Sequence, residues 1–182
     1  ISFKFGEGRL TSADAHETKA LFYSVKNNMN NLNEETKTNI DSFINSIPTQ
    51  KVFVDKPVGI LKKTKENQEI NEIVEKLKTT NASFNEITKT ENGGLFLKEL
   101  IKETMSGKHK FGKDNIACAD YYVQVSKESF EIKKIINIEN DIEIVDEFCQ
   151  KVIDKKFKNK NVICFKSSQG LNEKRKCWCR FL

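Results

Sequence analysis

The chain has 182 residues, of which 37% are hydrophobic and 31% are charged, and its formal net charge is +5. This length supports one domain with its own core, and the regular spacing of apolar residues excludes a disordered protein. No apolar run approaches the roughly 20 residues that a membrane-spanning helix needs, so we expect no transmembrane segment.

A short strand and two helices are predicted first. A strand within residues 1–10 is followed by three residues that can begin a helix: Thr11, Ser12 and Asp14. Apolar residues then recur at helical spacing as far as Leu32. Asn33 is a natural N-cap for the second helix, and Pro48 ends it. The two helices are expected to form an antiparallel pair.

Strand signals and two further helices complete the predicted N-terminal half. Within residues 50–55, Val52 and Val54 alternate with an outward Phe53, which predicts a short strand, and residues 58–61 offer a second one. Residues 66–80 carry their apolar side chains on one helical face. Residues 83–86 have the form of a capping box, and residues 93–107 predict a helix that ends at its last glycine.

Toward the C-terminus the spacing of apolar residues changes from about 3.6 residues, the period of a helix, to two residues, the period of a strand. Residues 121–125 and 130–138 both alternate and are separated by a short polar segment, which predicts an antiparallel hairpin. Residues 143–157 return to helical spacing. Residues 161–165 and 176–182 then predict a second hairpin around a polar loop.

These elements predict an α+β fold, with a helical N-terminal half packed against a small antiparallel sheet in the C-terminal half. That sheet consists of two hairpins flanking one helix. We expect residues 1–182 to form a single composite domain, because the C-terminal sheet has few large apolar residues for a core of its own. The alternative is a sub-boundary near residues 108–114, between a helical part (1–107) and a sheet-rich part (115–182).

All five cysteines lie after residue 117, and an odd number cannot pair completely within one chain. They are Cys118, Cys149, Cys164, Cys177 and Cys179. Residues two apart on a strand lie about 6.5 Å apart, so Cys177 and Cys179 cannot easily bond to each other. The expected register places Cys164 opposite residues 177–179, where a disulfide could form, and the remaining thiol could reach Cys149 or Cys118.

The sequence is compatible with three chemical states of these cysteines: disulfide-bonded, reduced or zinc-bound. Disulfides would suit a small hydrated domain outside the cell. Alternatively, the cysteines are reduced and act as small buried hydrophobes. A zinc site is the third option, but no C-x-x-C spacing occurs and both histidines lie far away in the sequence. The sequon Asn81-Ala82-Ser83, which falls between two predicted helical segments, is compatible with secretion.

Positive charge is concentrated at the end of the chain. Residues 151–182 carry ten Lys and Arg against two acidic residues, a net charge of +8, whereas residues 1–150 carry −3. Aromatic residues are interleaved with these cations, a mixture typical of surfaces that track phosphates and stack rings. The candidate binding residues are Phe165, Lys174, Arg175, Lys176, Trp178 and Arg180. The alternative is a solvated helix end followed by a charged edge strand.

Catalytic motifs are absent from the sequence: it has no G-x-S-x-G, H-E-x-x-H or glycine-rich phosphate loop. His16 or His109 could act as a base for a cysteine, although nothing in the sequence joins them. Glu143 and Asp146 could approach each other, but acidic residues at a helix start more often interact with its dipole. We therefore expect no catalytic residue, no cofactor and no metal.

Together these features predict a secreted, non-enzymatic interaction module. Its disulfide-held, basic and aromatic C-terminal hairpin would bind a partner protein or an anionic ligand such as a polymer or a lipid headgroup. One alternative is an intracellular, cytoplasmic nucleic-acid-binding module with reduced cysteines. Another is a small hydrolase-type enzyme that uses His16 or His109.

Overall fold

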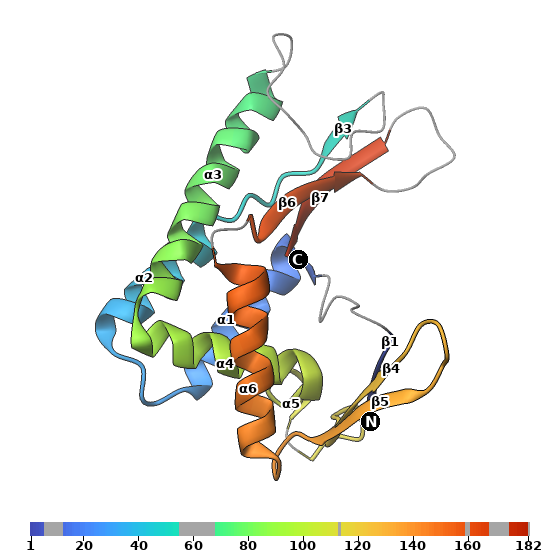
Figure 1. Cartoon of the computed structure of the whole chain (residues 1–182). Helices are drawn as coiled ribbons and strands as arrows, with labels where there is room; N and C mark the ends of the chain where they lie inside the picture. Colours follow the sequence, from blue (N-terminus) through green and yellow to red (C-terminus); the bar gives the residue numbers. More distant parts are fainter. Residues whose placement is uncertain (6–12, 55–67, 113, 159–160, 168–174, 182) are drawn as a thin grey trace.

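The chain is an α+β protein whose N-terminal half is dominated by helices, as predicted (Figure 1). The computed structural model describes residues 1–5, 13–54, 68–112, 114–158, 161–167 and 175–181. Only the backbone is described at residues 3–5, 53–54, 165–167 and 175–178. No helix in these ranges is both long and apolar enough to cross a membrane.

The described elements alternate along the chain between helices and short strands. The helices are α1 (Ala15–Asn28), α2 (Glu34–Ser46), α3 (Gln68–Lys89), α4 (Glu91–Ser106), α5 (Lys108–Phe111) and α6 (Ile142–Val152), which continues as a π-helical turn, η1 (Ile153–Phe157). The strands are β1 (Ser2–Phe5), β2 (Ala13–Asp14), β3 (Val52–Val54), β4 (Tyr121–Val125), β5 (Ile132–Asn137), β6 (Ile163–Ser167) and β7 (Arg175–Phe181).

Local capping chemistry sets three of the predicted helix ends. Asp14 is the N-cap of α1, and it forms a reciprocal capping box with Glu17. The Asn33 side chain accepts a hydrogen bond from the backbone N–H of Thr36 at 2.8 Å and caps α2. Gly107 ends α4 with a left-handed φ of 70°. These three predicted boundaries are confirmed.

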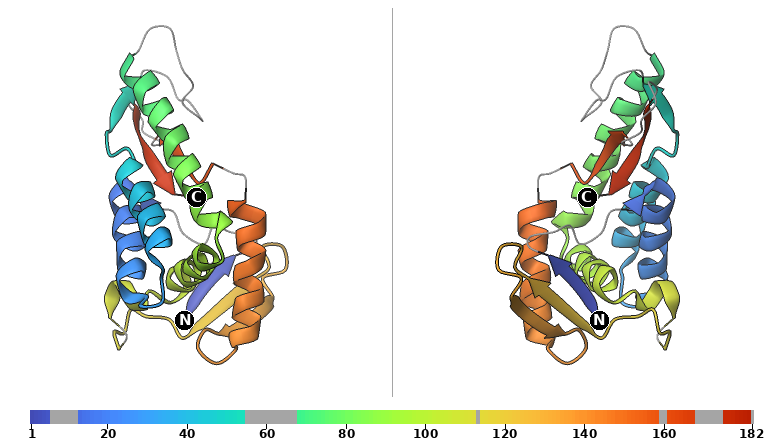
Figure 2. Two further views of the ribbon diagram at one scale, coloured as in Figure 1. Left: turned by 90° about the vertical axis from the view of Figure 1, so that its left-hand side faces the viewer. Right: turned by 90° about the vertical axis from the view of Figure 1, so that its right-hand side faces the viewer.

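Helices α1 and α2 pack side by side, as Figure 2 shows. The rings of Phe22 and Phe43 lie 4.6 Å apart between centroids, and the Lys26 ammonium forms an ion pair with Asp41. The predicted pairing of the first two helices is therefore confirmed.

Helix α3 is longer than the sequence pattern predicts. It runs without a break through residues 83–86, so the predicted capping box there is wrong. The Ser83 hydroxyl instead donates to the carbonyl of Thr79 at 3.0 Å, one turn earlier in the same helix. The chain turns later, where the Thr90 hydroxyl accepts a hydrogen bond from Gly93 N–H at 3.0 Å and caps α4.

Adjacent glycines in the first turn of α4 provide a matched pair of variants. A Cβ atom at Gly93 would lie 1.9 Å from the Ile87 carbonyl oxygen, whereas a Cβ atom at Gly94 would meet nothing within 4 Å. We expect Gly93→Ala to lower the free energy of unfolding by about 2 kcal/mol through overpacking. Gly94→Ala is expected to raise it by about 0.5 kcal/mol, because alanine is the better helix former.

Urea denaturation of the two variants checks this prediction. Equal effects of Gly93→Ala and Gly94→Ala would contradict the close approach of α4 to the end of α3.

The first sheet has the strand order β1-β4-β5. Strands β4 and β5 form the predicted antiparallel hairpin. Strand β1 pairs with β4 in parallel, with Ser2 opposite Tyr122. The inner face packs against α6, where the rings of Tyr122 and Phe148 lie 5.3 Å apart. This sheet is therefore mixed, and its third strand comes from the beginning of the chain.

The second sheet is built around the last strand of the chain. Strand β6 pairs antiparallel with β7 along residues 163–167, which confirms the second predicted hairpin. Strands β2 and β3 also pair antiparallel with β7, so they share its other edge. Strand β7 is therefore central in this sheet and not the edge strand considered above. The predicted strand at 50–55 is observed as β3, while residues 58–61 lie outside the described residues.

Phenylalanine rings from the whole length of the chain meet in the core. Phe181 lies 5.5 Å from Phe22, 6.2 Å from Phe84 and 5.9 Å from Phe157 between ring centroids. The same hydrophobic cluster contains buried residues from both sides of residues 108–114. The single-domain organisation itself stays a prediction.

Candidate functional site

The C-terminal sheet holds five of the six candidate binding residues within the described backbone, and Lys174 lies outside it. Register pairs Phe165 with Cys179 and Trp178 with Lys166 across the hairpin. On the other edge, Arg175 and Lys176 lie opposite Val54 and Phe53. Arg180 lies opposite Cys164 on one edge and Asp14 on the other. Arg180 is the one candidate with a described side chain.

Burial alternates along the described end of β7. Cys179 and Phe181 are 1% and 2% exposed and belong to the core, whereas Arg180 between them is only half-buried. This is the alternation expected of a strand with one face on the core.

The prediction of disulfides is wrong for every cysteine whose side chain is described. Cys118, Cys149, Cys164 and Cys179, the four cysteines with described side chains, form no disulfide. Cys164 pairs with Arg180 and not with a cysteine, which places it on the opposite face of the pleated sheet from Cys179. Cys149 lies against α4, with its sulfur 3.7 Å from the Lys98 carbonyl oxygen. The register of β6 and β7 therefore sets no cysteine opposite another, and Cys149 contacts α4 instead.

Two of these thiols are poor nucleophiles. Burial raises the pKa of Cys149 and of Cys179 to about 12, so both stay protonated at neutral pH. Cys118 is partly exposed, and its sulfur lies 3.0 Å from the Gly112 carbonyl oxygen. Among the described residues no group of three or more His, Cys, Asp or Glu is arranged to hold a metal ion.

Asn81 of the sequon is a structural residue. It lies inside α3, not between two helices, and is 7% exposed. Its amide nitrogen donates to the carbonyls of Leu77 and Ile163, at 2.9 and 3.1 Å. Its oxygen accepts from the backbone N–H groups of Val162 and Ile163, at 2.7 and 3.1 Å. A glycan cannot be attached to this side chain in the folded chain, so the sequon gives no support for secretion.

The candidate catalytic residues lie on different helices and have different neighbours. His16 is exposed in the first turn of α1. His109 lies on α5, with its Nε2 atom 3.3 Å from a carboxylate oxygen of Glu99. Asp146 approaches Lys98 and Lys102 of α4, at 3.9 and 3.5 Å. An ion-pairing role for Asp146 follows from these contacts.

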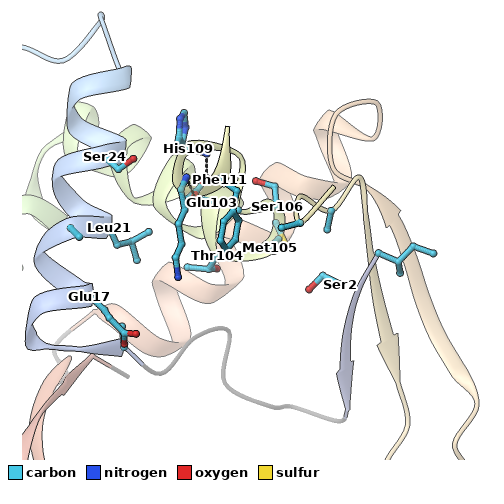
Figure 3. A pocket seen from close by; sticks show the side chains of 17 residues that line it. Ser2, Glu17, Leu21, Ser24, Glu103, Thr104, Met105, Ser106, His109 and Phe111 are labelled. Atoms are coloured by element: carbon cyan, nitrogen blue, oxygen red, sulfur yellow. Dashed lines mark hydrogen bonds between the residues drawn. The ribbon is translucent and has the colours of Figure 1, made fainter. Parts of the chain in front are cut away.

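A pocket of about 690 Å³ lies between α1 and the corner formed by α4 and α5 (Figure 3). Glu17, Leu21 and Ser24 line it from α1. Thr104 and Phe111 line it from the corner, and Lys110 adds an ammonium group. No motif in the sequence indicates this pocket, although α1 places the small residues Ala20 and Ser24 on the lining face, one helical turn apart.

Comparison with protein-family models, with curated proteins and with solved structures finds no match to this chain. Function must therefore be argued from the C-terminal sheet and the pocket themselves.

Proposed function

We propose that this protein is a non-enzymatic binding module that takes an anionic ligand on the basic C-terminal sheet. The candidate residues identified in the sequence are Phe165, Lys174, Arg175, Lys176, Trp178 and Arg180. Since positions 165 and 175 share a face of the sheet with Cys179, the ligand would contact the other face of β7, at positions 176, 178 and 180, and the connection that precedes it. An extracellular setting stays a prediction.

The observation that carries this proposal is the position of Arg180. Its side chain is half-buried while both neighbours on β7 are buried in the core. Strand β7 is paired on both edges, so its backbone is held in place by hydrogen bonds along β6, β2 and β3. In the proposal this pairing replaces the disulfides as the source of rigidity. A rigid cationic strand loses little entropy when it binds.

Charge supports the same sheet. The net charge of +8 over residues 151–182 contrasts with −3 over the rest of the chain. A concentration of one sign attracts ligands of the opposite sign and accelerates their association.

The test neutralises three of these cations. We expect the triple variant Lys174→Gln, Arg175→Gln, Lys176→Gln to bind heparin and a fluorescein-labelled single-stranded oligonucleotide at least about tenfold more weakly near 0.1 M salt. Fluorescence anisotropy gives the affinity for the oligonucleotide. Retention on a heparin column, measured as the eluting salt concentration, reports the second ligand.

A matched control removes the same charge elsewhere. Lys37, Lys78 and Lys89 are exposed, and each pairs with a glutamate on its own helix. Their triple change to glutamine lowers the net charge equally, and we expect it to leave both affinities within about twofold. Equal losses in the two triple variants would show that net charge alone is responsible, and no loss in either would remove the proposal.

Nucleic acid is the second candidate ligand class. The four described cysteines form no disulfide, which favours this class because reduced cysteines are typical of an intracellular protein. For a nucleic-acid site, the negative slope of log affinity against log salt should become less steep by about 2 in the C-terminal triple variant, at about 0.7 per neutralised contact with a single strand. An unchanged slope would argue against this class.

A further inference from the structure

The pocket between α1 and the α4–α5 corner is distinct from the C-terminal sheet and has a wall that is fixed before any ligand arrives. Glu103, 3% exposed, accepts hydrogen bonds from the backbone N–H groups of His109 and Lys110, at 2.8 and 2.9 Å. Gly107 makes the turn with a φ of 70°. A Cβ atom there would lie 3.0 Å from the Phe111 ring, so that ring packs directly over the turn.

The chemistry of this wall combines a ring with a cation. Phe111 is 44% exposed, and the Lys110 ammonium lies 5.1 Å from its ring centroid. Among the described residues no carboxylate oxygen lies within ion-pairing distance of Lys110. Both carboxylate oxygens of Glu103 are already occupied by backbone N–H groups. The ammonium and the ring are therefore available side by side to a ligand.

The opposite wall combines two apolar side chains, Ala20 and Leu21, with Ser24 and the one negative charge of Glu17. Figure 3 shows Leu21 and Glu17 of α1 across the hollow from Phe111 and Thr104. One Glu17 carboxylate oxygen accepts from the backbone N–H of Asp14 at 2.9 Å, so its charge is fixed at this wall. A second negative group on a ligand would be repelled there.

We propose that this pocket binds a planar aromatic monoanion. The ligand's ring lies between Leu21 and the exposed part of Phe111, and its negative group pairs with the Lys110 ammonium. The volume of about 690 Å³ is within the roughly 300–1,000 Å³ usual for small-molecule sites, and an apolar lining with few charged groups is their typical composition.

Titration of the full chain with 2-naphthoate, followed by amide ¹⁵N–¹H shifts, tests this site. We expect saturable shifts confined to residues that line the pocket. Lys110→Gln is expected to weaken binding about tenfold through loss of the charged partner. The uncharged 2-naphthamide should bind the unaltered chain about tenfold more weakly for the same reason.

Two further variants separate this pocket from other surfaces. Ala20 is exposed and lines the hollow, so Ala20→Phe fills it without disturbing the core and should abolish the shifts. Lys89→Gln makes the same charge change as Lys110→Gln on another helix and should bind 2-naphthoate normally. Absence of saturation in the unaltered chain, or binding unaffected by both Lys110→Gln and Ala20→Phe, would overturn the proposal. If 2-naphthamide bound as tightly as 2-naphthoate, the proposed pairing of the ligand's negative group with Lys110 would be overturned.

Discussion

Phe181→Ala is expected to lower the free energy of unfolding by about 4 kcal/mol, because it removes a fully buried ring from the core. The ring lies within 6.2 Å of those of Phe22, Phe84 and Phe157, so its loss leaves a cavity lined by other rings. Its neighbours come from α1, α3 and η1, which cannot all close on the space at once. Urea denaturation measures the change.

Phe130→Ala provides the comparison for this variant. Phe130 lies between β4 and β5 and is 73% exposed, so we expect its loss to change stability by less than about 0.5 kcal/mol. If Phe181→Ala proved as mild as Phe130→Ala, the burial of the Phe181 ring in the core would be contradicted.

Asn81→Leu should destabilise the fold by about 3–5 kcal/mol, since leucine leaves the buried N–H groups of Val162 and Ile163 and the carbonyl of Ile163 without partners. Each unpaired buried group costs about 1–3 kcal/mol, and only part of this is recovered by the added apolar surface. Leucine has the same branched arrangement of side-chain heavy atoms as asparagine and is larger, so the variant leaves no cavity. Thermal and urea unfolding both report this change.

Ser83→Ala is the matched control on the same helix. It also destroys the sequon, but within the described residues Ser83 hydrogen-bonds only to its own helix, so stability should change by less than about 0.5 kcal/mol. A large effect of Ser83→Ala, together with a small effect of Asn81→Leu, would contradict the role assigned to Asn81.

Those parts of the fold that depend on neighbouring residues could be predicted from the sequence. The caps at Asp14 and Asn33 and the glycine stop at Gly107 each act through atoms within a few residues. Both hairpins are also local, because the paired strands follow each other in the chain. The capping-box error at residues 83–86 has the same origin, since Ser-x-x-Glu fits inside a helix as well as at its start.

Pairing between distant strands could not be predicted in this way. Nothing in the periodicity of β1 indicates that it joins β4 in parallel, or that β2 and β3 share one edge of β7. The cysteine prediction failed for a related reason, because moving a register by one residue transfers a side chain to the other face. Cys164 therefore lies opposite Arg180 and not opposite residues 177–179. No local sequence pattern distinguishes these two registers.

The candidate sites differ in the same respect. The basic C-terminal residues are contiguous in sequence and were found from composition alone. The pocket joins α1 to the α4–α5 corner, about 90 residues later, so its lining becomes visible only in three dimensions.

The central position of β7 has a consequence for the order of folding during synthesis. Strands β2 and β3 are made early, yet the only strand with which they pair in the described chain is made more than 100 residues later. Until residues 175–181 leave the ribosome, β2 and β3 lack the strand with which they pair in the described chain. The ring of Phe181 is also missing from the core until then. During this interval the early strands have unpaired backbone groups and are therefore prone to aggregate.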